Sequence, residues 1–296
     1  YRRGTNEMVQ KYARSGSTAS IPLAEGRKQL DMTLSLGIVS VATNVYLDYW
    51  KSQAASLDRN VSPELPITIH IFTDRTSEAI EFSKSLNNLK VVAHEIPPYR
   101  WPEATLYRYK IFNEHKSELT QDILMYLDAD MLVHSTLSLS RLAPQGTAEA
   151  TLVKHPGYFR PTGLRRIKLY WQYRKLLVSD TYSRIKLGGL GAWETNPKSA
   201  AFVSRASRRN YYCGGIWWAP NAIFRDLVSE LDSRVNSDES AGLMAVWHDE
   251  SHINWWGTQH AHASQNPSFC FSTSYPWLTH LEMVVQAVDK DSMTRS

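Results

Sequence analysis

One short segment near the C-terminus carries the densest set of chemically active side chains in the chain. Trp247-His248-Asp249-Glu250-Ser251-His252-Ile253-Asn254 combines two adjacent carboxylates with two histidines. It follows an apolar, helix-like stretch, residues 241–246, so these groups should be partly desolvated and should need partners or a chemical purpose. The alternative is a helix N-terminus with acidic residues in its first turn, although a cap has no need of two histidines.

A pair of aspartates lies further upstream. Residues 123–133 are apolar except around Asp128 and Asp130, a pattern that indicates a buried strand interrupted near its end. In an extended chain, residues i and i+2 project to one face, which predicts that the two carboxylates converge. Convergent carboxylates repel each other unless a cation lies between them, and hard oxygen ligands suit Mg²⁺ or Mn²⁺. The alternative is a turn in which both aspartates are solvated.

The first half of the chain contains the elements that would position these groups, and its pattern indicates an α/β fold. Apolar runs alternate with amphipathic stretches, which predicts a mainly parallel sheet with ligand sites at the carboxyl ends of its strands. Pro97, Pro98 and Pro102 predict an irregular connection after the third strand. The predicted strands are 34–42, 67–72 and 89–96, and the predicted helices are 45–57, 76–86 and 106–115.

The second half has a different pattern. Residues 211–218 place Gly214 and Gly215 among bulky aromatic side chains, which would let a ligand approach the backbone closely. A tight β-bend in the core would use the same residues, so both interpretations stay open. Residues 221–235 follow as an amphipathic helix with an apolar residue at every fourth position.

Composition excludes a disordered or disulfide-built protein. A chain of 296 residues with 43% hydrophobic content can bury a large core. Its ten tryptophans and fifteen tyrosines suit the stacking of sugars, although most must lie in the core. Cys213 and Cys270 are the only cysteines and provide no disulfide framework. No apolar run reaches the roughly 18 to 20 residues that span a bilayer, and residues 1–30 are predicted to be a loosely packed lead-in.

Positive charge is concentrated in one segment. Between Arg160 and Lys186 lie eight basic residues and a single acid, Asp180, interleaved with large apolar side chains and followed by a glycine-rich exit. A basic amphipathic stretch can lie on an anionic membrane, bind nucleic acid or cover an anionic ligand. An ordinary surface helix would have the same pattern. Because the chain carries no known nucleic-acid-binding motif, we predict no nucleic-acid partner.

Four segments, in order, resemble the signature segments of glycosyltransferase family 6, which contains the histo-blood-group A and B transferases, the α-1,3-galactosyltransferase and Forssman synthase. They are Tyr126-Leu127-Asp128-Ala129-Asp130, His155-Pro156-Gly157-Tyr158-Phe159, Tyr211-Tyr212-Cys213-Gly214-Gly215 and residues 245–254. The last segment is the most specific. The resemblance covers residues 33–296, except that the basic segment looks like an insertion.

The resemblance implies a GT-A fold and a retaining glycosyltransferase. Such an enzyme would move galactose or N-acetylgalactosamine (GalNAc) from a UDP-sugar to the 3-hydroxyl of a galactose-terminated glycan, in α-1,3 linkage, with Mn²⁺ or Mg²⁺ as cofactor. It also implies one catalytic domain, residues 31–296. This domain would comprise a UDP-binding half (31–135) and an acceptor-binding half (136–296), the latter with a basic insertion (160–191).

The resemblance further implies roles for single residues. Asp128 and Asp130 would hold the metal, which acts as a Lewis acid for the departing UDP. Glu250 would act as nucleophile or would stabilise an oxocarbenium-like transition state. The donor would be bound by Val41, Ala42, Thr43, Tyr46, Arg108, Asp249, Lys290 and Arg295. The sugar substrates would be bound by His155, Cys213, Gly215, Trp247 and His248.

Several expectations about donor, location and rival functions complete this interpretation. Glycine at position 215 would leave space for an acetamido group and favours UDP-GalNAc, whereas Cys213 departs from the family pattern. By analogy with animal members, we expect a Golgi membrane protein with a lumenal catalytic domain and an anchor before Tyr1; a soluble cytoplasmic protein is the alternative. Two other function classes stay open: a metal-dependent nucleotide-sugar hydrolase, and an inert sugar-binding or membrane-binding scaffold.

Overall fold

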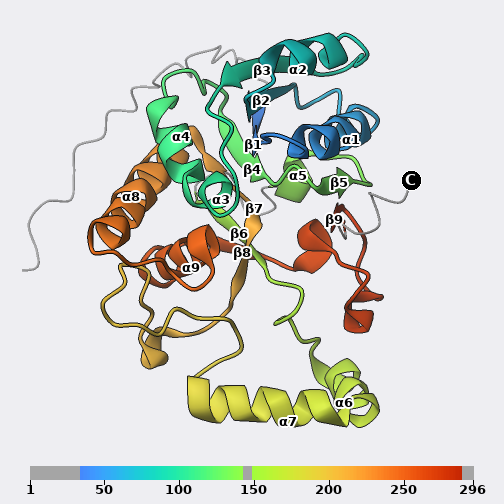
Figure 1. Ribbon diagram of the computed structural model, residues 1–296. Helices are drawn as coiled ribbons and strands as arrows, with labels where there is room; N and C mark the ends of the chain where they lie inside the picture. The colour runs from blue at the N-terminus through green and yellow to red at the C-terminus, as the bar shows by residue number, and fades with distance from the viewer. Residues whose placement is uncertain (1–33, 143–148, 289–296) are drawn as a thin grey trace, which may run out of the picture. The chain divides into compact units, whose positions relative to one another are not determined.

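The protein is built around a mixed β-sheet, seen in a computed structural model that describes residues 34–142 and 149–288 (Figure 1). The strands are β1 (Leu36–Val41), β2 (Ile67–Thr73), β3 (Lys90–Glu95), β4 (Ile123–Leu127), β5 (Met131–Val133), β6 (Thr151–Lys154), β7 (Tyr212–Pro220), β8 (Ala263–Gln265) and β9 (Val285–Ala287). Seven of them form one sheet in the order β3-β2-β1-β4-β7-β6-β8, and β5 pairs with β9.

The sheet is parallel over its first four strands and changes direction in the middle. β3, β2, β1 and β4 run parallel, β7 is antiparallel to both β4 and β6, and β8 is parallel to β6. This confirms the α/β class and the mainly parallel sheet, and the architecture is that of a GT-A-like fold. The switch between β4 and β7 matters for the site, because ligands bind at such points in open α/β sheets.

Helices cover both faces of the sheet. The helices of the described residues are α1 (Tyr46–Asp58), α2 (Thr76–Ser83), α3 (Glu103–Leu106), α4 (Arg108–Glu114), α5 (Leu139–Leu142), α6 (Gly163–Gln172), α7 (Arg174–Tyr182), α8 (Asn221–Ser240) and α9 (His248–Gln259). Of these, α6 and α7 lie away from the sheet in Figure 1. A π-helical turn follows α7 at Ser183–Leu187, and 3₁₀ turns occur at Arg205–Ser207, Pro267–Cys270 and Pro276–Leu278. None of the helices in the described ranges is both long and apolar enough for a membrane span.

Each face of the sheet has its own hydrophobic cluster, because side chains alternate along a strand. In β4, Met125 and Leu127 belong to the cluster under α1 and α2, whereas Leu124 and Tyr126 belong to the cluster under α4, α8 and α9. Figure 1 shows these two groups of helices on opposite sides of the sheet. The face toward α4 and α9 is the one from which Tyr126 reaches the candidate site.

Most of the predicted elements are confirmed, with four corrections, of which three follow here. The predicted helix 106–115 is divided at Tyr107 into α3 and α4. The strand before the aspartate pair ends at Leu127, so Asp128 and Asp130 lie in a turn rather than in an extended segment. The glycines at 214 and 215 lie within β7, so the interpretation as a tight bend is wrong.

The predicted helix-like stretch 241–246 is also wrong. α8 runs further than expected, to Ser240, and then stops in a Schellman motif. Gly242 adopts a φ of 66°, its N–H donates to the Glu239 carbonyl (2.9 Å), and the Leu243 N–H donates to the Asp238 carbonyl (2.8 Å). Glycine tolerates this left-handed conformation, so the chain leaves the helix at Gly242 although the residues that follow are apolar. The acidic segment that follows forms the helix instead, as α9.

Candidate active site

A cavity of about 410 Å³ lies at the carboxyl ends of β1 and β4. Val41 and Thr43 line it from the end of β1, and Tyr46 lines it from the start of α1. Asp128 and Asp130 line it from the turn after β4. The predicted donor residues and the predicted metal ligands therefore lie around one space. Two of the described donor residues do not line this cavity. Ala42 is fully buried and hydrogen bonds through its N–H to the Phe72 carbonyl, and Asp249 lines a neighbouring cavity.

Polar contacts shape the turn that follows β1. The Thr43 hydroxyl and the Asn44 side-chain amide both donate to the Tyr99 carbonyl, at 2.7 and 3.1 Å. Asn44 has a φ of 55°, and its N–H donates to Asp74 at 3.0 Å. Asparagine tolerates this conformation better than most residues. The turn thereby brings the proline-rich connection, with Tyr99 and Trp101, over the cavity.

A second cavity of about 440 Å³ adjoins the first, and the two share Trp101, Thr105, Arg108 and Asp128. Together they form one cleft. The second cavity is lined further by His155, Tyr158, Ala192, Gly214, Gly215, Trp247, His248, Asp249, Glu250 and Tyr275. The fold therefore brings together four of the five predicted substrate residues with Asp249 and Glu250. Cys213, the fifth, is buried in the core, where its thiol faces Cys270 and burial raises its pKa.

Arg108 connects the two acidic parts of the cleft. Its Nη1 lies 3.0 Å from Asp249 Oδ2, and its Nη2 lies 3.4 Å from Asp128 Oδ1. The guanidinium also lies over the Tyr126 ring, 4.4 Å from its centroid, and Tyr126 donates its hydroxyl to Asp128. Burial disfavours the charge of Arg108, but Asp249 and Asp128 outweigh burial and raise its pKa. Arg108 is therefore a permanently charged link at the centre of the site.

Asp249 and Glu250 occupy the first turn of α9, as the helix-start interpretation required, yet they also face the cleft. Glu250 Oε2 accepts the Gly214 N–H at 2.9 Å, a bond to β7 rather than to its own helix. Burial raises the pKa of Asp249 to about 7, against the opposing effect of Arg108. Burial likewise raises the pKa of Glu250 to about 7, against the Gly214 N–H and the Tyr211 hydroxyl. Such shifts are typical of functional carboxylates.

The two glycines of β7 make room for these carboxylates. A Cβ atom at Gly214 would lie 2.9 Å from Asp249 Oδ2 and 3.0 Å from Glu250 Cβ. A Cβ atom at Gly215 would lie 2.5 Å from Asp128 Oδ2 and 2.6 Å from Met131 Cε. The space beside Gly215 is thus filled by Asp128, whereas the sequence suggested room for a donor acetamido group. Gly214 was not among the predicted site residues, although the Gly-Gly pair was a usable signal.

The histidines of the site segments differ in environment. His155 is mostly buried, and burial lowers its pKa to about 4, so it is neutral near pH 7. Its Nδ1 accepts the Gly157 N–H at 3.1 Å. Burial also lowers the pKa of His248, whose ring meets Trp101 edge to face. His252 is fully buried behind the cleft and 3.6 Å from Asp238, so it belongs to the core.

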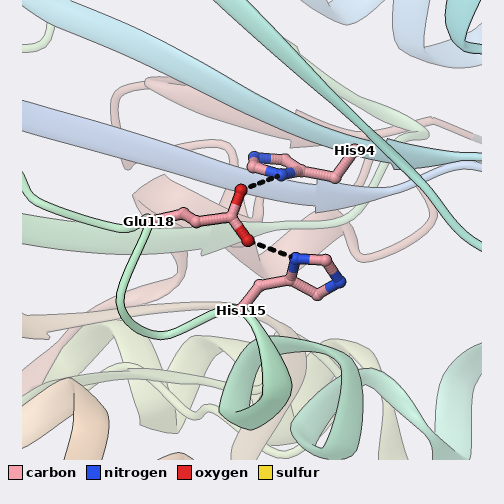
Figure 2. Close-up of side chains that lie close together, drawn as sticks. All are labelled: His94, His115 and Glu118. Carbon is pink, nitrogen blue, oxygen red and sulfur yellow. Dashed lines mark hydrogen bonds and ion pairs between the residues drawn. The ribbon is translucent and has the colours of Figure 1, made fainter.

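A separate histidine cluster lies at the edge formed by β3 and the end of α4 (Figure 2). His94 Nδ1 lies 3.2 Å from Glu118 Oε2, and His115 Nδ1 lies 2.7 Å from Glu118 Oε1. One ligand atom from each residue falls within 4.8 Å of the others, close enough to hold a metal ion. None of these residues lines the cleft. No sequence pattern predicted the cluster, because β3 supplies His94 whereas the end of α4 and the residues after it supply His115 and Glu118.

Other residues of the site were missed or cannot be placed. Tyr99, Trp101 and Tyr275 line the cleft but were not predicted, although the aromatic residues between Pro98 and Pro102 offered a signal. Lys290 and Arg295, predicted to contact the donor, lie outside the described residues.

Comparisons with known proteins agree with the signature segments. The model of Glycosyltransferase family 6 matches residues 190–294. The chain is 24% identical over 246 residues to Histo-blood group ABO system transferase 1 of Rattus norvegicus, a match that covers 82% of this chain and 61% of that protein. It is 22% identical over 251 residues to Globoside alpha-1,3-N-acetylgalactosaminyltransferase 1 of Gallus gallus, covering 84% and 63%.

A bacterial protein shows the same similarity. The chain is 23% identical over 222 residues to the O-antigen biosynthesis glycosyltransferase WbnI of Escherichia coli, covering 75% of this chain and 81% of that protein. The chain spans about three fifths of the length of the rat and chicken relatives. These similarities confirm the resemblance to the family that the four segments predicted.

Proposed function

We propose that this chain, a relative of glycosyltransferase family 6, is a retaining glycosyltransferase. It would transfer galactose or GalNAc from a UDP-sugar to the 3-hydroxyl of a galactose-terminated glycan, in α-1,3 linkage. The observation that carries this proposal is the single cleft in which Arg108 links the Asp128 turn to Asp249, beside Glu250. The names of the rat, chicken and bacterial relatives, all sugar transferases, support the same reaction class.

The first cavity is proposed to hold the nucleotide. Tyr46 offers a ring for the uracil, and Val41 and Thr43 line the same wall. Asp128 and Asp130 present carboxylate oxygens, the donor atoms that suit Mn²⁺ or Mg²⁺, so the residues fit such an ion. When bound, the ion supplies Lewis-acid assistance to the diphosphate leaving group. Lys290 and Arg295 remain proposed contacts to the same phosphates.

The second cavity is proposed to hold the reacting sugars. The Gly214 N–H fixes one oxygen of Glu250, so the carboxylate keeps its direction while staying beside the cavity. Glu250 would act as nucleophile or would stabilise positive charge on the sugar, and both routes remain open. Trp247 is half exposed and would stack on the apolar face of the acceptor galactose, worth about 1 kcal/mol.

The direct test measures UDP release from UDP-GalNAc and from UDP-galactose. Reactions contain Mn²⁺ or EDTA, with and without galactose-terminated acceptors, and compare the wild type with Glu250→Gln. We expect turnover that needs both metal and acceptor, and a loss of about 100-fold or more in Glu250→Gln. Glu64→Gln, at an exposed position before β2, is the matched control and should keep full activity.

Other outcomes would identify the rival functions. Metal-dependent UDP release that ignores the acceptor would point to a nucleotide-sugar hydrolase. If the protein neither released UDP nor bound the donor, the inert scaffold would be the remaining function. The initial rates with UDP-GalNAc and with UDP-galactose will identify the preferred donor. Gly215 does not predict it, because Asp128 fills the space beside Gly215.

We also propose that the basic segment lies on an anionic membrane surface. Exposed large apolar side chains concentrate there: Leu164 is 83% exposed, Trp171 76% and Val178 70%. The one acid of the segment, Asp180, is buried and bound by Arg160 through two bonds, Nε to Oδ2 at 2.6 Å and Nη2 to Oδ1 at 2.9 Å. The other basic residues therefore have no acidic partner within the segment, which suits anionic lipid.

Sedimentation with lipid vesicles tests this membrane contact. The protein should bind vesicles that contain phosphatidylserine and should not bind pure phosphatidylcholine. Trp171→Ser should weaken binding about 10-fold, since it removes a large exposed ring that would be buried in the lipid. Ile80→Ser, an exposed apolar residue of α2, should have no effect. Equal binding of the two vesicle types, or an equal effect of the two variants, would contradict the proposal.

A further inference from the structure

A third cavity, about 630 Å³, adjoins the acceptor side of the cleft, and Tyr158 lines both. We call it the basic cavity, because its lining carries six cationic side chains and no acidic one. The six are Lys154, Arg160, Arg166, Arg184, Arg208 and Arg209. Three distant parts of the chain contribute them: the end of β6, the basic segment and the loop before β7.

Among the residues that the structure describes, one of the six cations has an acidic partner. Asp180 neutralises Arg160, which also lies over the Trp277 ring at 4.7 Å and donates to the Gly157 and Phe159 carbonyls at 2.7 Å. Within residues 34–142 and 149–288, the other five form no ion pair. A group of like charges around one cavity produces a strong local positive potential.

Of the six cations, Arg208 is buried and held in place, whereas Arg166, Arg184 and Arg209 are exposed. The Arg208 side chain is only 7% exposed, and its Nε and Nη2 donate to the Val203 carbonyl at 3.2 and 3.0 Å. Burial, together with the nearby Arg205, lowers the pKa of Arg208. The buried Arg208 cation thus donates its hydrogen bonds to neutral carbonyl groups. A bound anion would stabilise its charge further.

The lining also indicates the kind of anion. Five of the six cations are arginines, whose planar guanidinium groups match carboxylates and phosphates with paired hydrogen bonds. Tyr158 separates the basic cavity from the space proposed for the acceptor galactose, and its ring packs against Tyr211 with centroids 5.1 Å apart. A ligand that occupies both cavities would carry its anionic group close to the galactose.

We propose that the basic cavity binds an anionic substituent, a carboxylate or a phosphate, on the sugar next to the acceptor galactose. The proposal deepens the proposed glycosyltransferase function and rests on it for the identity of the ligand as an acceptor. It makes the enzyme selective for acidic glycans over neutral ones.

A matched pair of acceptors tests this selectivity. Galactose linked to glucuronic acid and galactose linked to glucose differ only by a carboxylate in place of a hydroxymethyl group. We expect a KM about 10-fold lower for the acidic acceptor, with a similar kcat, and a preference that weakens as NaCl is raised. Arg209→Gln and Arg184→Gln should each remove most of the preference and leave the KM of the neutral acceptor unchanged. Arg174→Gln, in the same segment but outside the basic cavity, is the control.

Direct binding separates failure of this proposal from failure of the proposed function. Saturation-transfer NMR with Glu250→Gln protein should detect the acidic disaccharide, and the signal should be lost on further substitution Arg209→Gln. This result would support the anion site even if no transfer occurred. Equal KM values with equal binding of both disaccharides would overturn it, as would a loss of UDP affinity in Arg209→Gln, which would assign the cavity to the donor.

Discussion

At the scale of single residues, three carboxylates in the cleft lie close to one buried cation, Arg108. Arg108 contacts Asp128 and Asp249 directly, while Glu250 relies on the Gly214 N–H. Because burial raises the pKa of Asp249 and of Glu250 to about 7, both groups resist ionisation near neutral pH. Ionisation of Asp249 and Glu250 therefore lowers the stability of the folded protein, and a cationic ligand in the cleft would offset that loss.

This balance predicts how Glu250→Gln alters stability with pH. A carboxyl group whose folded pKa is raised binds extra protons in the folded state, so its contribution falls as pH rises from about 4.5 toward about 7. At pH 5.5 Glu250 is protonated and resembles glutamine, whereas at pH 8 it carries a buried charge. Glu250→Gln should therefore raise the Tm more at pH 8 than at pH 5.5, as measured by calorimetry without donor or metal.

A control at an exposed site isolates this effect. Glu64→Gln should shift the Tm equally at the two pH values. Histidines with lowered pKa values, such as His155, act in the opposite direction below pH 6.5, but they are common to all three proteins and cancel in the comparison. An equal shift for Glu250→Gln at both pH values would show that its carboxyl group is not perturbed.

Gly214→Ala should damage the site more than the fold. The new Cβ would press on Asp249 Oδ2 and on the backbone of Glu250, 3.2 Å away at Cα, and neither can move freely. We expect a loss of about 1–3 kcal/mol in the free energy of unfolding and a fall in kcat/KM on the order of 100-fold. Gly257→Ala, in α9 against the flexible Leu152 side chain, should change both quantities little.

At the scale of elements, the position of the Asp249 and Glu250 carboxylates depends on how α9 is joined to β7. The Asn254 side chain accepts the Tyr212 N–H and donates to the Tyr212 carbonyl, both at 2.8 Å. It thereby makes the two hydrogen bonds to β7 that a neighbouring strand would make. Its amide also donates to the Glu250 carbonyl at 2.8 Å. The register of β6 and β7 shifts next to Tyr212, where a regular ladder would otherwise supply these bonds.

Asn254→Ala should therefore weaken both the fold and the site. Two buried backbone groups of Tyr212 would lose their partner, which should lower the free energy of unfolding by about 2–4 kcal/mol in urea titrations. Activity should fall as well, since α9 carries Glu250. Asn236→Ala, which removes an exposed bond to Asp232 within α8, should cost less than about 0.5 kcal/mol. Equal costs for the two variants would rule out this role for Asn254.

At the scale of the whole molecule, the cleft lies where the parallel part of the sheet meets the antiparallel part. The Asp128 N–H donates to the Gly215 carbonyl at 2.8 Å, so the end of β4 and the start of β7 are joined at the site. The two cavities, proposed to hold the donor and the acceptor, share Arg108 and Asp128. The division into a UDP-binding half, 31–135, and an acceptor-binding half, 136–296, stays a prediction.

Binding of UDP with Mn²⁺ should accordingly stabilise the protein. At a free ligand concentration about 100 times the Kd, mass action adds about 2.7 kcal/mol, a rise in Tm of several degrees in thermal-shift measurements. Neither UDP with EDTA nor Mn²⁺ alone should match it, and Asp128→Asn should abolish it. Asp226→Asn, an exposed aspartate of α8, should behave as the wild type. A full shift from UDP with EDTA would exclude metal-assisted donor binding.

Local patterns in the sequence determined the α/β class and most of the predicted elements, because hydrophobic periodicity reports on each strand and helix by itself. The same local signals picked out Asp128, Asp249 and Glu250, whose density in apolar surroundings is unusual. Where a local signal competed with turn chemistry it failed, as at residues 241–246, where Gly242 ends α8.

Only the tertiary structure decided which of these groups meet. The contacts of Arg108 with Asp128 and Asp249, the His94–Glu118–His115 cluster and the basic cavity each join segments that are distant in the chain. Such contacts depend on strand order and direction, above all on the reversal between β4 and β7. No residue pattern within a single segment contains that information, because the order and direction of strands follow from the packing of the whole sheet.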